Sequence, residues 1–250
     1  MHLKVIACEV LAREVYHCAA LSPNTVEISL FTQGLHDNSD TCRAQLQTEI
    51  DAAPADKFDA VVLGYGLCNN SMAGVHAGAQ RLVIPRAHDC ISLFLGSKER
   101  YARLFSERPG TYYYTAGWLE YAERKGERVE YSPASGLTKR MALEELIEKY
   151  GEENGRFLFE SMSGWEVHYT HGALVTFPFT AALGLEEQVR EICLKKNWEY
   201  VEIAGDLRLL HRCSADRGPP TISLSWSRVS RCGRATTRRS SRPAPALPPE

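Results

Sequence analysis

The sequence contains no run of about 18 apolar residues, the length that a membrane-spanning helix requires. Its first residues lead directly into a strand pattern, and Glu9, Arg13 and Glu14 soon interrupt the apolar stretch. This pattern differs from a secretory signal peptide. We therefore expect a cytoplasmic protein that has no membrane partner and whose thiols stay reduced.

Several metal-site and catalytic motifs are also missing. There is no C-x-x-C pair, no H-E-x-x-H, no recognisable Ser/His/Asp triad motif and no P-loop lysine. The eight cysteines are too dispersed for a zinc finger or ribbon. In a reducing compartment we interpret them as free, metal-bound or catalytic rather than as a disulfide framework. We assign no site role to five of them: Cys18, Cys42, Cys193, Cys213 and Cys232.

Lysine is absent from residues 213–250, which hold seven arginines, two acidic residues and six of the twelve prolines. Such a composition buries too little apolar area to fold, so we expect a disordered basic tail. Two alternatives stay open: a tail that binds anionic partners, and a shifted reading frame, which we favour. Residues 1–212 keep 22 basic and 29 acidic residues, and this acidic body predicts no nucleic-acid partner.

Short apolar runs alternate with helical patterns along the first part of the chain. This alternation predicts a parallel, doubly wound sheet in a first lobe, residues 1–109. Asp89 is expected to cap the last helix of this lobe, before Pro109 and Gly110 end the unit. The expected strands are 3–7, 26–31, 59–64 and 81–85, and the expected helices are about 9–20, 40–52, 70–78 and 90–106.

A second lobe is expected over residues 110–212, because the same alternation continues there. The predicted fold class is therefore α/β, with two Rossmann-like three-layer lobes, mainly parallel sheets and a cleft between the lobes. The expected elements are strands 111–115, 173–177 and 198–203, an acidic helical stretch of about 138–161, and a helix at 185–196.

Three cysteines follow three of the predicted strands, where each strand turns into the next helix. They are Cys8, Cys68 and Cys90. The carboxyl ends of parallel strands line one edge of a sheet, so these thiols are expected to converge. A position at the start of a helix lowers the pKa of a thiol and favours the thiolate. Core packing of three ordinary buried cysteines is the competing interpretation.

His88 precedes Cys90 by two residues, so both side chains point the same way in an extended segment. Three thiolates and one imidazole suit tetrahedral zinc, and three sulfurs could instead anchor an iron–sulfur cluster. We predict a metal site made by Cys8, Cys68, His88 and Cys90. His88 is also the candidate catalytic acid or base, although a simple hydrogen-bonding role is equally open.

The turn after the third strand carries Gly64, Gly66 and Asn69. Its glycines allow a ligand to approach the backbone, and its amides could bind an anion. We predict these three residues as cofactor-binding. The turn lacks the third glycine of a dinucleotide fingerprint, so it does not predict a nucleotide.

Together these motifs resemble the bacterial and archaeal family of domains of unknown function numbered 1638 (DUF1638). The matching segments are Ala7 to Glu9, Gly64 to Cys68, Pro85 to Cys90, Pro109 to Tyr113, Thr115 to Trp118 and Gly205 to Leu210. Members often accompany corrinoid-dependent methyltransferases, which implies a supporting role in one-carbon metabolism.

The residues and the resemblance together predict a zinc-thiolate protein that supports corrinoid-linked methyl transfer. Its partner would be a small molecule or a corrinoid protein, and the sequence does not indicate an oligomeric state. Two alternatives stay open: a non-catalytic protein that binds a metal or a corrinoid, and a metal-free thiol enzyme.

Overall fold

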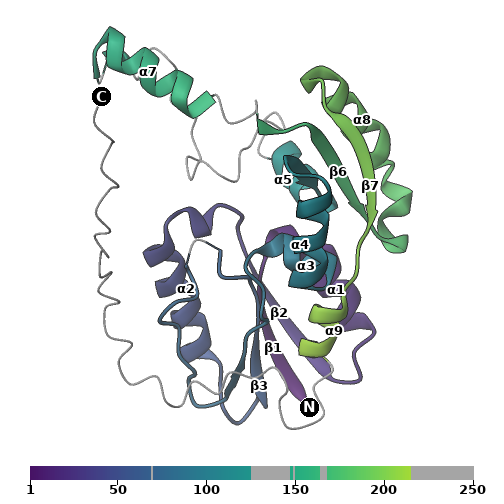
Figure 1. Cartoon of the computed structure of the whole chain (residues 1–250). Coiled ribbons are helices and arrows are strands. Elements are labelled where there is room, and N and C mark those ends of the chain that lie inside the picture. The colour runs from purple at the N-terminus through teal and green to yellow at the C-terminus, as the bar shows by residue number, and fades with distance from the viewer. Residues whose placement is uncertain (69, 125–146, 149, 164–167, 215–250) are drawn as a thin grey trace, which may run out of the picture.

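Two parallel sheets organise the part of the chain that the structure describes (Figure 1). The structure is a computed structural model, and it describes residues 1–214 except 69, 125–146, 149 and 164–167. The first sheet has the order β2-β1-β3-β4 and the second β5-β6-β7, which confirms the α/β prediction. The strands are β1 His2–Cys8, β2 Thr25–Phe31, β3 Ala60–Gly64, β4 Arg81–Val83, β5 Thr111–Tyr114, β6 His171–Thr176 and β7 Glu199–Ala204.

Helices cover both faces of the first sheet. Figure 1 shows α2 on one side of this sheet and α1 with α9 on the other. All of the predicted helices except one have a counterpart wherever the structure describes the chain. No described helix is long and apolar enough to cross a membrane. The helices are η1 Glu9–Leu11, α1 Ala12–Ala20, η2 Leu35–Asp37, α2 Ser39–Ala52, α3 Cys90–Leu95, α4 Lys98–Glu107, α5 Ala116–Arg124, α7 Glu152–Ser163, η4 Pro178–Leu183, α8 Leu185–Lys196 and α9 Arg208–Ser214.

The helix predicted over 70–78 is wrong, since the described part of this segment consists of turns and irregular chain. Asn70 and Gly74 have positive φ values of 60° and 92°, which a right-handed helix does not contain. The segment is instead held to α2: the Gln47 side chain accepts from the His76 amide at 3.0 Å and donates to the His76 carbonyl at 3.2 Å. Side chains of α2 thus satisfy backbone groups that a helix would have paired internally.

The helix predicted over 90–106 is divided into α3 and α4. Gly96 ends α3 with a φ of 77°, and Ser97 caps α4 by accepting from the Arg100 amide at 3.0 Å. A Cβ atom at Gly96 would lie 2.7 Å from a side-chain carbon of Asp206, so no larger residue fits there. The break therefore brings the first lobe into contact with the chain that follows β7.

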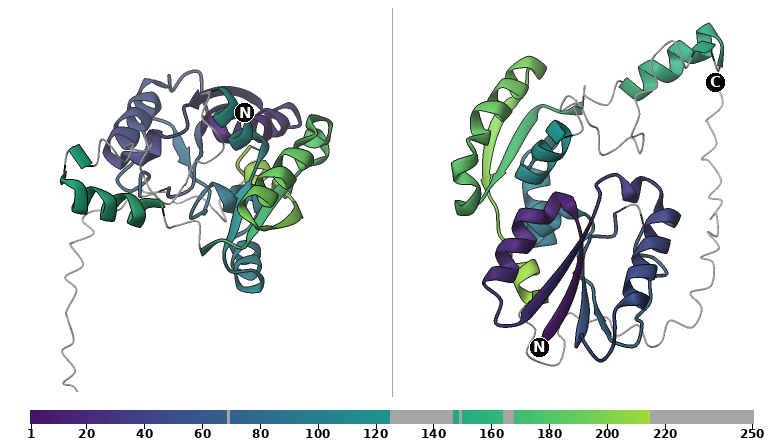
Figure 2. Two further views of the ribbon diagram at one scale, coloured as in Figure 1. Left: turned by 90° about the horizontal axis from the view of Figure 1, so that it is seen from above. Right: turned by 180° about the vertical axis from the view of Figure 1, so that it is seen from behind.

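The second sheet buries alternate side chains on opposite faces, as strand geometry requires. Tyr113 of β5 joins the large core of the first sheet, whereas its neighbours Tyr112 and Tyr114 pack with Val189 and Cys193 of α8. Helix α8 has the predicted limits. Figure 2 shows β6, β7 and α8 set to one side of the first sheet. The expected helical residues 138–146 lie outside the described part of the chain.

The end of the second lobe returns to the first. Leu210 and Cys213 of α9 are buried in the same core as the first sheet, so the two lobes share an apolar core. Helix α9 includes Cys213 and Ser214, the first two residues of the expected tail, and residues 215–250 lie outside the described part. Arg13 of α1 also donates from Nε to Glu120 of α5 at 2.8 Å. A cavity of about 530 Å³ lies where His17 and Phe179 meet the end of β7.

Candidate functional site

Cys8, Cys68 and Cys90 lie at the carboxyl edge of the first sheet, as the strand pattern predicts. Cys8 is the last residue of β1, Cys68 follows the turn after β3, and Cys90 begins α3. All three are free thiols; Cys8 is buried, and the other two are partly exposed. The topology therefore brings together residues separated by as many as 82 positions.

Hydrogen bonds join the two loops that carry Cys68 and Cys90. The Leu67 amide donates to the Ala87 carbonyl at 3.0 Å, and the Cys68 amide donates to the His88 carbonyl at 3.1 Å. These bonds extend the contact between β3 and β4 beyond the last paired residues of the two strands. The loop after β3 is thus fixed against the start of α3.

Burial controls the pKa values of the three thiols. Burial chiefly raises the pKa of Cys90, and the charges of Cys68 and Cys8 raise it further. Burial likewise raises the pKa of Cys8 to about 12, with a smaller contribution from Cys68. The structure thus places the three cysteines at one edge of the first sheet, where the loops of Cys68 and Cys90 are hydrogen-bonded to each other.

The expected lowering of the thiol pKa values is wrong. Burial raises the pKa of Cys68 to about 11, and backbone hydrogen bonds with Gly66 and Cys90 offset only part of this effect. A thiolate loses its hydration when it is buried, and here that loss outweighs the partial charges at the start of a helix. At neutral pH and without a metal, these three cysteines are protonated.

Cys42 is a fourth thiol at this site, and the sequence analysis gave it no site role. It lies in the first turns of α2, the helix that follows β2, and it is fully buried. Its charge raises the pKa values of Cys8 and Cys68, and burial raises the pKa of its own thiol. Cys8, Cys68 and Cys90 were selected because each lies where a strand turns into the next helix. Cys42 also follows a strand, β2, but it lies farther into its helix, α2.

Tyr65 is a second residue that the sequence analysis missed. Its side chain is 2% exposed, and its hydroxyl has no hydrogen-bond partner among the described residues. Burial raises the pKa of this phenol, and the charges of Cys8, Cys42 and Cys68 raise it further. A buried donor with no partner therefore lies beside the thiols. The sequence offered only a turn residue between two glycines.

His88 does not join the thiols. Its side chain is 81% exposed, and its Nδ1 lies 3.3 Å from Oδ2 of Asp89. Asp89 caps α3 as predicted, because its Oδ1 accepts from the Ser92 amide at 2.9 Å. Among the described residues, no three His, Cys, Asp or Glu side chains stand close enough to hold a metal ion. The predicted ligand set of Cys8, Cys68, His88 and Cys90 is therefore not preassembled.

The two glycines predicted to bind a cofactor contact other parts of the protein. A Cβ atom at Gly64 would lie 2.5 Å from the Cβ of Ala7, and one at Gly66 would lie 2.7 Å from the Asp89 backbone. Close packing between protein segments thus explains both glycines. Asn69, the third residue predicted for this role, lies outside the described part of the chain.

The second lobe also reaches this edge. Tyr101 of α4 and Tyr113 of β5 make an edge-to-face contact with ring centroids 5.7 Å apart. Burial raises the pKa of both phenols, and the charge of Asp89 adds to it. The Asp89 carboxyl and the start of α3 therefore lie near one aromatic side chain from each lobe, Tyr101 and Tyr113.

A family model covers most of the chain. The model described as "Protein of unknown function (DUF1638)" matches residues 30–214. The chain belongs to this family. The match ends at the last residue of α9, so the DUF1638 unit includes the helix that packs back onto the first lobe. This DUF1638 chain has no significant match to a curated protein or to a solved structure.

Proposed function

We propose that Cys8, Cys68 and Cys90 bind one soft metal ion, with zinc as the first candidate. Their shared position at the carboxyl edge of the first sheet supports this assignment, together with the hydrogen bonds that hold the loops of Cys68 and Cys90 against each other. Thiolate sulfur is a preferred ligand of zinc and of iron–sulfur clusters. An iron–sulfur cluster on the same sulfurs is the variant of this proposal.

Binding requires the side chains to rearrange, since the described thiols do not stand at ligand distance. The metal must also displace the thiol protons, which burial holds in place. Cys42 is better placed than His88 to complete the set, because it is buried near the start of α2 and its charge acts on Cys8 and Cys68, whereas the His88 side chain is 81% exposed. We therefore propose Cys42 as the fourth ligand.

The proposed biological role is support of corrinoid-linked methyl transfer in one-carbon metabolism, and it rests on the family resemblance. While Cys42 is not bound, a zinc ion held by the other three thiolates would keep an open position, and it would lower the pKa of a further thiol or water bound there. The chain itself would supply the thiolates, and the buried Tyr65 hydroxyl would supply one hydrogen bond. A small molecule or a corrinoid protein would be the partner.

The raised pKa values also bear on the alternatives. A metal-free thiol enzyme requires a thiolate near neutral pH, and buried cysteines with pKa values of about 11 to 12 supply almost none. A non-catalytic protein that holds a metal or a corrinoid needs no such thiolate. This holding role is therefore the second candidate, and the metal-free enzyme is disfavoured.

Metal analysis of protein purified without oxygen tests the proposal. We expect about one zinc ion per chain, or a visible absorption band for an iron–sulfur cluster. Cys8→Ser, Cys68→Ser and Cys90→Ser should each remove most of the metal. Cys193→Ser is the matched control, because Cys193 is buried in the second lobe with its sulfur 3.8 Å from the Gly172 carbonyl oxygen. Unchanged metal content in all three site variants, or none in the unaltered protein, would overturn it.

A further inference from the structure

A second cavity lies beside the loops that follow β3 and β4. It has a volume of about 340 Å³, and its walls are mainly apolar. Small-molecule sites commonly begin at about this size, about 300 Å³, and they occur at the carboxyl ends of strands in open α/β sheets. We call this cavity the β4 pocket. Its walls include Leu67, Met72, Val75 and Ile84, and Arg86 and His88 also line it.

The β4 pocket carries a basic rim on an acidic protein. Arg86 is exposed and forms no ion pair with the described residues. His88 is 81% exposed and is the second basic group of the rim. Residues 1–212 have seven more acidic than basic residues, so an unpaired arginine at a pocket stands out. Guanidinium groups bind carboxylates through two parallel hydrogen bonds.

The pocket and the thiol edge share the same two loops. Leu67 is 45% exposed in the pocket wall, and Cys68 follows it with a φ of 37°. Left-handed backbone at a residue other than glycine is uncommon and concentrates at ligand sites. Because Leu67 is hydrogen-bonded to Ala87, the pocket wall cannot move without moving the chain that leads to Cys90.

We propose that the β4 pocket binds a small carboxylic acid, with its apolar body against Leu67, Met72 and Val75 and its carboxylate on Arg86. The charge of Arg86 selects an anion, and the apolar walls select a body without polar groups. As a statement about the substrate of the thiol edge, this inference rests on the proposed function. As a statement about binding, it stands on the pocket alone.

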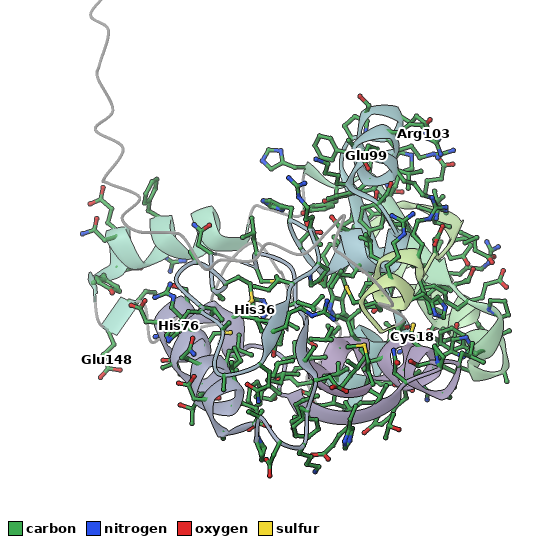
Figure 3. The ribbon with its side chains drawn as sticks, turned by 90° about the horizontal axis from the view of Figure 1, so that it is seen from below. Cys18, His36, His76, Glu99, Arg103 and Glu148 are labelled. Carbon is green, nitrogen blue, oxygen red and sulfur yellow. The ribbon has the colours of Figure 1, made fainter. Side chains whose placement is uncertain are left out.

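Calorimetric titration with hexanoate tests the charge preference. We expect hexanoate to bind about tenfold more tightly than 1-hexanol, and hexylamine not to bind detectably. Arg86→Met should reduce the affinity for hexanoate to that for 1-hexanol. Arg103→Met is the matched control and should change neither affinity. Figure 3 labels Arg103 on α4 far from His76, the neighbour of the wall residue Val75.

A pocket-filling variant tests the location. Ala73 lines the β4 pocket and is exposed, so Ala73→Trp can fill the cavity without disturbing the core. This variant should abolish the binding of both hexanoate and 1-hexanol. Ala77→Trp, at an exposed position outside the lining, should leave both unchanged. Circular dichroism and thermal melting confirm that each variant is folded. Hexanoate that binds no better than hexylamine, or that still binds to Ala73→Trp, overturns the inference.

The two proposals can fail separately. Hexanoate binding that persists in chelator-treated protein and in Cys68→Ser, with no metal found in any sample, rejects the metal site and keeps the pocket. Stoichiometric metal without hexanoate binding rejects the pocket and keeps the metal site. Metal content that stays unchanged in Ala73→Trp shows that the pocket variant has not damaged the thiol edge.

Discussion

The amide of Cys68 donates a hydrogen bond to the carbonyl of His88 at 3.1 Å, so two loops from neighbouring strands are held face to face. The bond places the Cys68 side chain beside the start of α3, where Cys90 lies. It also separates the roles of two adjacent residues: Asp89 caps the helix, and His88 turns out toward the β4 pocket. Both the thiol edge and the pocket depend on this contact between loops.

Zinc affinity should rise steeply with pH. Burial raises the pKa values of Cys8 and Cys68 to about 12 and 11, so below those values each bound thiol must release one proton. Four thiol ligands, with Cys42 as the fourth, give a slope of about four in a plot of log affinity against pH between pH 6 and 8. Competition with a chromophoric chelator at several pH values measures this slope. A slope near zero would show that the ligands are not these protonated thiols.

Gly66→Ala should destabilise the protein and weaken metal binding together. A Cβ atom at this position would lie 2.7 Å from the Asp89 backbone, so the two loops must separate. Overpacking of this kind costs about 1–3 kcal/mol of the free energy of unfolding. Gly78→Ala is the control, because its nearest neighbour is the end of the Gln80 side chain at 3.3 Å. Urea unfolding and metal analysis measure the two effects, and equal stability of both variants would contradict the prediction.

Tyr65→Phe should leave the protein folded and slightly more stable. The buried hydroxyl has no partner among the described residues, and an unsatisfied buried donor costs about 1–3 kcal/mol. If the hydroxyl donates to a group bound at the thiols, the same variant should lower metal or ligand affinity about tenfold. Tyr114→Phe, at another buried tyrosine packed with α8, is the comparison. A large loss of stability specific to Tyr65→Phe would point to a hydrogen bond within the protein.

Most of the fold follows from local patterns. Continuous apolar runs predicted buried parallel strands such as β1 and β3, and the periodicity of residues 185–196 gave α8 its observed limits. The helix prediction for residues 70–78 failed because Gln47 of α2 satisfies the amide and carbonyl of His76. This contact joins residues that are distant in the sequence, so local patterns do not reveal it. The break at Gly96 depends on Asp206, which is 110 positions away.

The candidate site could be predicted only in part, for related reasons. Strand ends selected Cys8, Cys68 and Cys90, because topology alone brings them to one edge. The pKa direction failed, since burial depends on everything packed around a thiol and not on its place at a helix start. The prediction of His88 as a ligand failed because it assumed an extended segment. The hydrogen bond from the Cys68 amide to the His88 carbonyl and the helix cap formed by Asp89 turn the His88 side chain outward.

Glu14→Gln should make the protein more stable at pH 8 and have little effect near pH 4.5. Burial raises the pKa of Glu14 from 4.5 to about 7, and both of its carboxyl oxygens lack hydrogen-bond partners among the described residues. The folded state binds the Glu14 proton more tightly than the unfolded state does. The free energy of unfolding therefore falls as the pH rises above 4.5, and the fall is complete once the pH exceeds about 7. The full shift corresponds to about 3 kcal/mol of the free energy of unfolding.

The pH profile separates this effect from a general change in packing. Glu187→Gln, at an exposed position of α8, should show no such dependence and serves as the control. Urea unfolding between pH 4.5 and 8 should give a stability difference between the unaltered protein and Glu14→Gln that grows with pH and levels off above 7. A difference that is constant across this range would contradict the prediction, because the Glu14 carboxyl would then not titrate between pH 4.5 and 8.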